Sequence, residues 1–217
     1  MNPVSSLWST RQQTLADASG RIYGVVVGIV TDNQDPEQLG RVKVKLPWLA
    51  DEAESNWARV ATLMAGNERG VFYLPEVDDE VLLAFEHGDL RAPFVVGALW
   101  NGKDKPPLTN ANGENNQRLI KSRSGLTILL DDSAGAEKIE IADKEGKQKV
   151  VIDMAGKKIV ITSGGDLDIT AEQGAVAIKA KTINLEASAD VKIKATGALN
   201  TEGQSVNIKG QPMVNIN

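Results

Sequence analysis

The chain has 217 residues, no cysteine, one histidine and a net charge of −5. These numbers exclude disulfides, thiolate metal sites and histidine-rich metal sites, and the length allows one large or two small domains. Residues 1–118 carry 11 basic and 16 acidic side chains, whereas residues 119–217 carry 13 of each. Neither half has the strongly basic field that nucleic-acid-binding proteins use.

The N-terminal segment, residues 1–20, is polar and contains no apolar core of a signal peptide. No apolar run in the chain approaches the ~18–20 residues that span a bilayer. We therefore expect synthesis in the cytoplasm without a signal peptide. We predict that residues 1–20 are an arm that becomes ordered on a partner.

Residues 21–102 are predicted to form a small closed β-barrel. Short valine-rich runs alternate there with Gly, Pro, Asn and Asp turn signals, and no long amphipathic helix interrupts them. Residues 41–46 (RVKVKL) alternate strictly, which predicts one buried and one wet face. The strand candidates are residues 23–30, 41–46, 57–63, 71–74, 81–85 and 94–100.

A linker is predicted at residues 103–118, because the stretch 101–117 contains two prolines and five asparagines. Strands resume at Leu119. Their first apolar groups are eleven residues apart, which predicts longer turns. These groups are Leu126/Ile128/Leu130, Ile139/Ile141 and Val150/Ile152.

From Ile159 onward, apolar residues at n and n+2 recur every seven to nine positions, and only Leu199/Thr201 breaks the pairing. The two members of a pair point the same way along a strand. A unit this short cannot enclose its own core. The burial of two inward side chains does not offset the ~1–2 kcal/mol per residue that ordering the backbone costs. Three chains wound together would close a triangular section and pair every strand edge.

We therefore predict an all-β protein in which residues 119–217 form an intertwined trimeric β-helix. An ordinary antiparallel sandwich is the alternative, although sandwich loops vary more in length. Amyloid-like or adhesin rods are a further alternative that leaves the N-terminal barrel unexplained. The predicted trimer core is Ile159, Ile161, Leu167, Ile169, Val176, Ile178, Ile183, Leu185, Val191, Ile193, Val206 and Ile208.

Several motifs of the barrel region resemble the baseplate protein V family, which includes the central spikes of contractile phage tails and the VgrG tips of type VI secretion. They are residues 23–30 (YGVVVGIV), 39–44 (LGRVKV) with Pro47-Trp48, 57–60, 72–77, 80–82, 85–89, Pro93 and 97–102 (GALWNG). The resemblance implies an OB-fold barrel followed by a triple-stranded β-helix needle.

The resemblance also implies a function: a structural, membrane-puncturing spike that transmits the force of sheath contraction to the target cell envelope. Its implied partners are a trimeric hub protein at the N-terminal barrel and a separate PAAR-like tip protein at the C-terminus. The target cell envelope would be contacted transiently. The spike would be assembled in the baseplate of a virion or phage-tail-like particle. The alternative is a VgrG-like tip of a secretion system that carries effectors.

Three departures from the family pattern are informative. Asp78 stands where the family usually has Gly, and we expect the turn to survive because Asp tolerates left-handed backbone. The chain ends without the His-x-His iron site of some phage spikes. We predict that this end (Val214, Asn215, Ile216 and Asn217) docks the tip protein. No hub-like region precedes the barrel in this sequence, so we expect the hub to be a separate protein.

No residue pattern predicts an enzyme, a cofactor or a metal. His87 lies alone in a turn, without the nucleophile and orienting group of a triad. Two further candidates fit solvated turns better than catalytic or metal sites: the acidic cluster Glu76, Asp78, Asp79 and Glu80, and the pair Asp131-Asp132. The pair Gly164-Gly165 has no helix behind it to hold a phosphate.

A distant alternative is an OB-fold that binds single-stranded nucleic acid through stacked aromatics and a basic groove. Arg41, Lys43, Lys45 and Trp48 could serve in this way. Aromatic residues make up only 4% of the chain, however, and the barrel half is acidic. We therefore expect no nucleic-acid partner.

Overall fold

The computed structural model describes residues 20–49, 54–211 and 214. In these residues the regular elements are β-strands and one 3-10 turn, η1 (Glu86–Gly88). None of the described segments forms a helix long and apolar enough to cross a membrane. The chain divides into two compact units, Met1–Gly164 and Gly165–Asn217.

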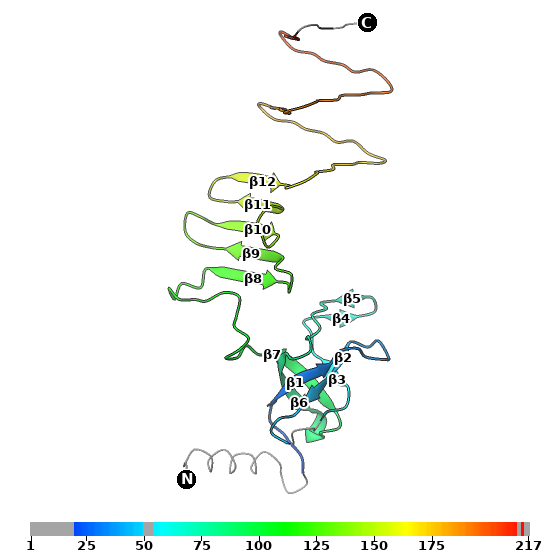
Figure 1. Cartoon of the computed structure of the whole chain (residues 1–217), viewed down its shortest axis with the longest axis vertical. Coiled ribbons are helices and arrows are strands. Elements are labelled where there is room, and N and C mark those ends of the chain that lie inside the picture. Colours follow the sequence, from blue (N-terminus) through cyan, green and yellow to red (C-terminus); the bar gives the residue numbers. More distant parts are fainter. Residues whose placement is uncertain (1–19, 50–53, 212–213, 215–217) are drawn as a thin grey trace. The chain divides into compact units, whose positions relative to one another are not determined.

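The first part of unit 1 is a closed barrel, as the sequence predicted (Figure 1). Its strands run in the order β1-β2-β3-β7-β6, and closure leaves no free edge. Neighbours pair antiparallel, except β3 and β7, which are parallel. The strands are β1 (Val26–Asp32), β2 (Arg41–Lys45), β3 (Ala58–Val60), β6 (Glu80–Phe85) and β7 (Pro93–Ala98).

Inward-facing apolar side chains fill the barrel, because alternate residues of a strand point to opposite faces. Gly28 of β1 is also buried. A Cβ atom there would lie 2.7 Å from Leu83 Cδ1 and 3.2 Å from the Lys45 carbonyl oxygen, so the close packing requires glycine. The side chains without solvent exposure include Val30, Val42, Val44, Val81 and Leu83.

The prediction of a barrel strand at residues 71–74 is wrong. The chain instead forms a small hairpin from β4 (Ala65–Gly66) and β5 (Arg69–Gly70), which the Val71 N–H extends by donating to the Met64 carbonyl at 3.0 Å. The five barrel strands already close on one another, so no edge remains for residues 71–74 to join.

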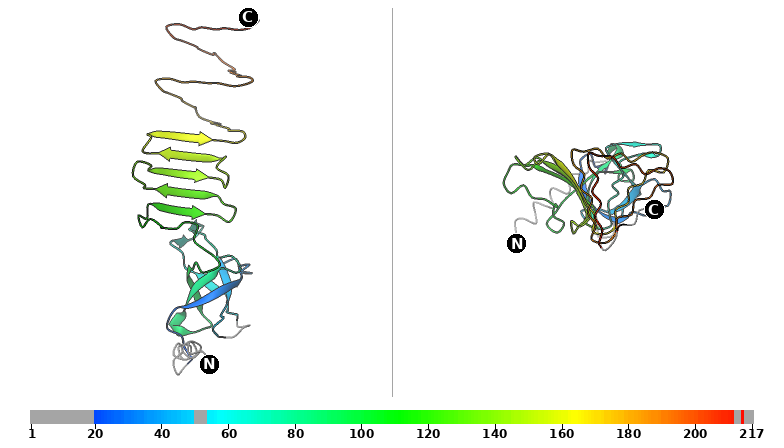
Figure 2. Two further views of the ribbon diagram at one scale, coloured as in Figure 1. Left: turned by 60° about the vertical axis from the view of Figure 1, so that its left-hand side comes forward. Right: turned by 90° about the horizontal axis from the view of Figure 1, so that it is seen from above.

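The second part of unit 1 is a five-stranded antiparallel meander, in which each strand pairs with the next in sequence (Figure 2). Its turns of four to six residues let consecutive strands fold back on one another. The prediction that strands resume near Leu119 is confirmed. The strands are β8 (Gln117–Lys121), β9 (Thr127–Asp131), β10 (Lys138–Ala142), β11 (Lys149–Asp153) and β12 (Lys158–Thr162).

The meander differs from the predicted intertwined β-helix in the way its strands pair. Its strand ladders form within one chain, whereas an intertwined β-helix would pair strands of different chains. Ile159 and Ile161, predicted to begin the eight-residue repeat, are the last apolar pair of the meander in β12. Residues 117–162 therefore satisfy most of their backbone groups without a partner.

The described part of unit 2 has no assigned strand, and it follows an open, winding path (Figure 1). Backbone bends nevertheless recur along it at the spacing of the sequence repeat. Each extended stretch between bends carries one n, n+2 pair. The bends from the end of unit 1 onward lie at residues 164–165, 172–174, 181, 188–189, 196–197, 203–204 and 211.

Candidate functional site

The meander has one apolar face, which its register builds. Ile139 lies opposite Leu130 on one side and Ile152 on the other, and the next pair along each strand aligns in the same way. The result is an apolar band two side chains wide across β9, β10, β11 and β12, to which β8 adds Ile120 alone, since Arg118 lies opposite Leu130. This apolar face consists of Ile120, Ile128, Leu130, Ile139, Ile141, Val150, Ile152, Ile159 and Ile161.

The apolar face is open to solvent in the single chain. Ile159 is 68% exposed and Ile141 is 51% exposed, whereas Val42 and Val44 of the barrel core are fully covered. In a sandwich, a second sheet would cover such a face, so the meander is not half of one within this chain. Continuous apolar surface of this extent marks an interaction site.

The opposite face of the meander carries mainly charged and polar side chains along its margins and a central row that includes Leu119, Leu129, Val151 and Val160. Gln117 donates to Asp131 at 2.8 Å, and the Lys138 ammonium pairs with Glu140 at 3.0 Å. Hydrogen bonds from Ser133 and then Gln117 lower the pKa of Asp131 to about 2. Asp131 is thus ionised at neutral pH, and this face combines charged margins with a half-buried apolar centre.

The predicted core residues of unit 2 are also exposed. From Leu167 to Ile208, the side chains assigned to the trimer core are between 51% and 75% exposed. Their burial in a trimer therefore stays a prediction. Val214 of the predicted tip-docking end is exposed as well, whereas Asn215, Ile216 and Asn217 lie outside the described residues, as do residues 1–19 of the predicted arm.

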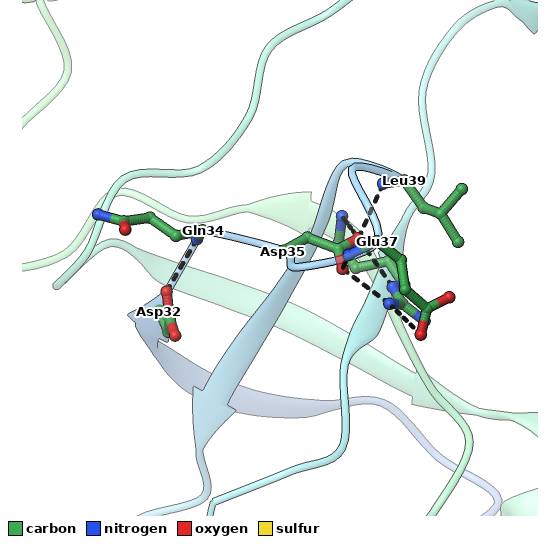
Figure 3. A network of polar contacts seen from close by, with 6 residues as sticks. Asp32, Gln34, Asp35, Glu37 and Leu39 are labelled. Atoms are coloured by element: carbon green, nitrogen blue, oxygen red, sulfur yellow. Dashed lines mark hydrogen bonds and ion pairs between the residues drawn. The ribbon is translucent and has the colours of Figure 1, made fainter.

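A clamp centred on Asp35 fixes the loop between β1 and β2 (Figure 3). The Asp35 carboxylate accepts hydrogen bonds from the backbone N–H groups of Glu37, Leu39 and Arg41 and from the Arg41 guanidinium, at 2.7–3.3 Å. Its side chain is only 3% exposed. The Arg41 guanidinium, followed by the backbone donors, holds the pKa of Asp35 far below its usual value.

Sequence reasoning missed the Asp35 clamp. The loop bends through left-handed backbone at Gln38 (φ 57°) and Gly40 (φ 69°), and the clamp stabilises that path. The available signal was an Asp at the loop start, followed by Gly-Arg at its end. An ionised Asx side chain at that point commonly collects backbone donors.

The residues considered for chemistry form no catalytic group. His87 is exposed in η1 with φ 48°, and its carbonyl oxygen accepts from Arg21. Glu76 pairs with Arg123 at 2.8 Å, and Asp78 adopts the left-handed backbone (φ 76°) expected of it. Among the described residues, no group of three or more His, Asp or Glu side chains could hold a metal ion.

The proposed nucleic-acid contacts are engaged within the protein. Asp35 and Glu37 hold Arg41, and Glu54 holds Lys43 at 2.9 Å. The Trp48 indole N–H donates to the Val27 carbonyl at 3.2 Å. These side chains are therefore not arranged as an open stacking and phosphate-binding groove.

Comparison with known families identifies the barrel. The model of the Type VI secretion system/phage-baseplate injector OB domain matches residues 26–100. The barrel of this chain is an injector OB domain. This agrees with the closed five-stranded topology and with the resemblance carried by the motifs in β1 and β2.

Several relatives of this chain are spike proteins. Type VI secretion system spike protein VgrG1a of Pseudomonas aeruginosa is 30% identical over 138 residues, which are 58% of this chain and 22% of the relative. VgrG3 of Vibrio cholerae is 25% identical over 154 residues, 69% of this chain and 14% of the relative. The chain thus spans less than a quarter of the length of these relatives. Because the aligned stretches are longer than the OB domain, the similarity extends beyond the barrel.

Proposed function

We propose that this protein is the central spike of a contractile injection machine, in which three copies build one needle below a collar of barrels. The injector OB domain and the VgrG relatives support placement in such a machine. The observation that carries the proposal is the solvent exposure of the apolar face of the meander and, separately, of the apolar pairs of unit 2.

Three copies explain why these side chains are exposed in one chain. Three meanders with their apolar faces turned to a common axis would form a triangular prism, and the charged side chains on the opposite faces would stay in water. In unit 2, each extended stretch would find strand partners in the other two chains. The residues predicted from sequence, from Ile159 to Ile208, would then form a continuous core along the axis.

The function of such a needle is mechanical. Backbone hydrogen bonds between strands and an interlocked apolar axis resist bending and unfolding, so that force from sheath contraction reaches the target envelope. The stability of the needle would be largely kinetic, because the three chains must separate together. No catalytic group is needed for this role.

The proposal places a partner at each end. A trimeric hub would bind the barrels with the help of residues 1–20, and a PAAR-like tip protein would dock on Val214, Asn215, Ile216 and Asn217. The target envelope would be contacted only during firing. The spike would reside in the baseplate of a virion or phage-tail-like particle.

A second candidate function is a VgrG-like tip of a type VI secretion system that carries effectors. The relatives favour it, because several are type VI secretion system spike proteins. Both candidates need the same trimeric needle. They differ in the sheath and tube with which the spike assembles, so co-purification with a phage tail or with a secretion apparatus separates them.

The first test of the needle is the mass of the purified chain in solution by light scattering, together with an SDS gel of an unheated sample. We expect about 70 kDa, three times the 23.2 kDa of one chain, and a band of that mass that survives SDS without heating. A monomer of 23.2 kDa would contradict the proposal.

A further inference from the structure

Two Asn-Gly pairs lie in the connection between β7 and β8, Asn101-Gly102 and Asn112-Gly113. Glycine has no side chain to shield its backbone nitrogen or to restrict its backbone. The nitrogen can therefore reach the side-chain carbonyl carbon of the preceding asparagine, and an attack there releases ammonia. The contacts that hold each asparagine decide which of the two pairs can react in the folded protein.

Asn101 is fixed to the barrel. Its Oδ1 accepts hydrogen bonds from the backbone N–H groups of Lys103 at 2.8 Å and Asp104 at 2.7 Å. Its Nδ2 donates to the Glu80 carboxylate of β6 at 3.1 Å, and its backbone N–H donates to the Asp104 carbonyl at 2.9 Å. The residue is also partly buried. Several of these contacts must break before the side chain can turn toward the nitrogen of Gly102.

Asn112 is held by its own loop alone. Its Oδ1 accepts from the backbone N–H of Glu114 at 3.2 Å, and its Nδ2 donates to the Glu114 carboxylate at 3.2 Å. The N–H of Gly113 donates to the Asn110 carbonyl at 3.1 Å. All four residues are exposed, and no printed bond of the described chain ties the Asn112 side chain to a strand. Exposed hydrogen bonds within a short turn open at low free-energy cost.

We propose that Asn112 is a site of spontaneous modification, which deamidates through a cyclic imide. The backbone nitrogen of Gly113 bonds to Cγ of Asn112, the bond from Cγ to Nδ2 breaks, and ammonia leaves with the proton of the Gly113 nitrogen. Water then adds to either carbonyl carbon of the ring and opens it. The product at position 112 is aspartate or isoaspartate, and water is the only co-reactant.

The modification would loosen the loop that precedes β8. The Glu114 carboxylate accepts hydrogen bonds from Asn112 and, at 2.9 Å, from the Asn116 amide. Deamidation removes the first of these donors and places a second carboxylate beside Glu114, where the like charges repel. Isoaspartate also adds a methylene group to the main chain. We therefore expect the turn at residues 110–113 to lose order as the protein ages.

The test is peptide mapping of the full chain by liquid chromatography and mass spectrometry, which separates the asparagine, aspartate and isoaspartate forms. One sample is incubated folded in mildly alkaline buffer, and a second is incubated in concentrated guanidinium chloride. A sample digested without incubation gives the background. In the folded chain, we expect Asn112 to react at least about tenfold faster than Asn101, because breaking one or two hydrogen bonds first slows a reaction by about that factor. In denaturant the two rates should become similar, since both sites are Asn-Gly.

Two variants of Asn112 separate the reaction from its effect on the loop. Asn112→Gln keeps an amide but requires a larger ring, so it should stay unmodified during the same incubation. Asn112→Asp has the charge of the product from the start. Amide hydrogen exchange at residues 113–115 should be faster in Asn112→Asp than in Asn112→Gln. The position is exposed, so both variants should fold.

Equal rates at Asn101 and Asn112 in the folded chain would overturn the inference. So would an unmodified Asn112 in the folded chain after a time in which the denatured chain has reacted, because the turn would then protect this residue too. Equal hydrogen exchange in the two variants would refute the loosening of the loop. None of these results depends on the proposed trimer, which the mass in solution tests separately.

Discussion

The barrel and the C-terminal region contain the same kind of apolar residues, but these residues are buried in the barrel and exposed in the C-terminal region. Val44 in the barrel is fully covered, whereas Ile193 in unit 2 is 67% exposed, although both are β-branched residues at alternating positions of an extended chain. Alternation along a strand creates an apolar face, but it does not supply the residues that bury that face. The barrel covers itself by closing, whereas the C-terminal region would be covered by other copies in the proposed trimer.

Whether a sheet can close around its own apolar side chains depends on the length of chain available per strand. The barrel uses variable turns and one parallel pairing to bring β7 beside β3, so that its sheet returns to β1. The meander adds strands in one direction only, and the repeat of unit 2 has about eight residues for strand and turn together. Neither can wrap around its own apolar side chains, so the comparison predicts independent stability for the barrel and cooperative assembly for the rest.

The largest expected effect comes from Ile193→Asp. Three carboxylates would meet near the needle axis without water or counter-charges, so we expect loss of the trimer by light scattering and of the band that survives SDS. The barrel should stay folded, which tryptophan fluorescence can follow because all four tryptophans lie in residues 1–100. Lys192→Asp, one position away on the predicted outward face, is the control. A soluble, fully trimeric Ile193→Asp protein would refute the inward assignment.

Leu83→Ala should destabilise the barrel and leave the needle assembled. Leu83 is fully covered, and deletion of a buried leucine side chain costs about 2–5 kcal/mol. Unfolding followed by tryptophan fluorescence should shift to lower denaturant concentration, while the mass stays that of a trimer. Leu63→Ala is the matched control, because Leu63 is 93% exposed and its change should be small. Equal effects at the two sites would mean that the barrel core is not as described.

A smaller loss is expected for Gly28→Ala. The added methyl group would press on Leu83 and on the Lys45 carbonyl oxygen, and overpacking of this kind costs about 1–3 kcal/mol. The same fluorescence measurement applies. Gly24→Ala, which would meet no atom within 4 Å, should change the unfolding free energy little. A neutral Gly28→Ala would show that the barrel can expand at this point.

The smallest effect concerns acid stability and Asp35. The folded-state pKa of Asp35 lies below its usual value of about 4, so its ion pair with Arg41 contributes stability above that pH and loses it as the pH falls further. We expect the barrel to unfold more readily at pH 3 than at pH 7, and Asp35→Asn to reduce this difference. Glu68→Gln, at an exposed site of the hairpin, is the control. An unchanged pH dependence in Asp35→Asn would exclude the clamp as its source.

The sequence was most informative where a pattern repeats. Strict alternation in residues 41–46 predicted β2, and the eleven-residue spacing of apolar groups predicted the strands of the meander. Residues 71–74 look equally strand-like, yet form no barrel strand, because the available edges are taken by partners distant in the chain. The hollow lined by Leu39, Met64 and Phe72 was also missed, since these residues are brought together only by the fold and by the Asp35 clamp.

By itself, the sequence determined the all-β character, the barrel with its family motifs, and the period of the apolar pairs, because each depends on local alternation and on turn residues. Only the tertiary structure decided how the strands pair. It closed five strands into a barrel and folded the next five into a single-chain meander. It also showed that the paired side chains of this one chain stay in water. Strand pairing and burial join residues far apart, and no local pattern specifies which edge a strand will meet.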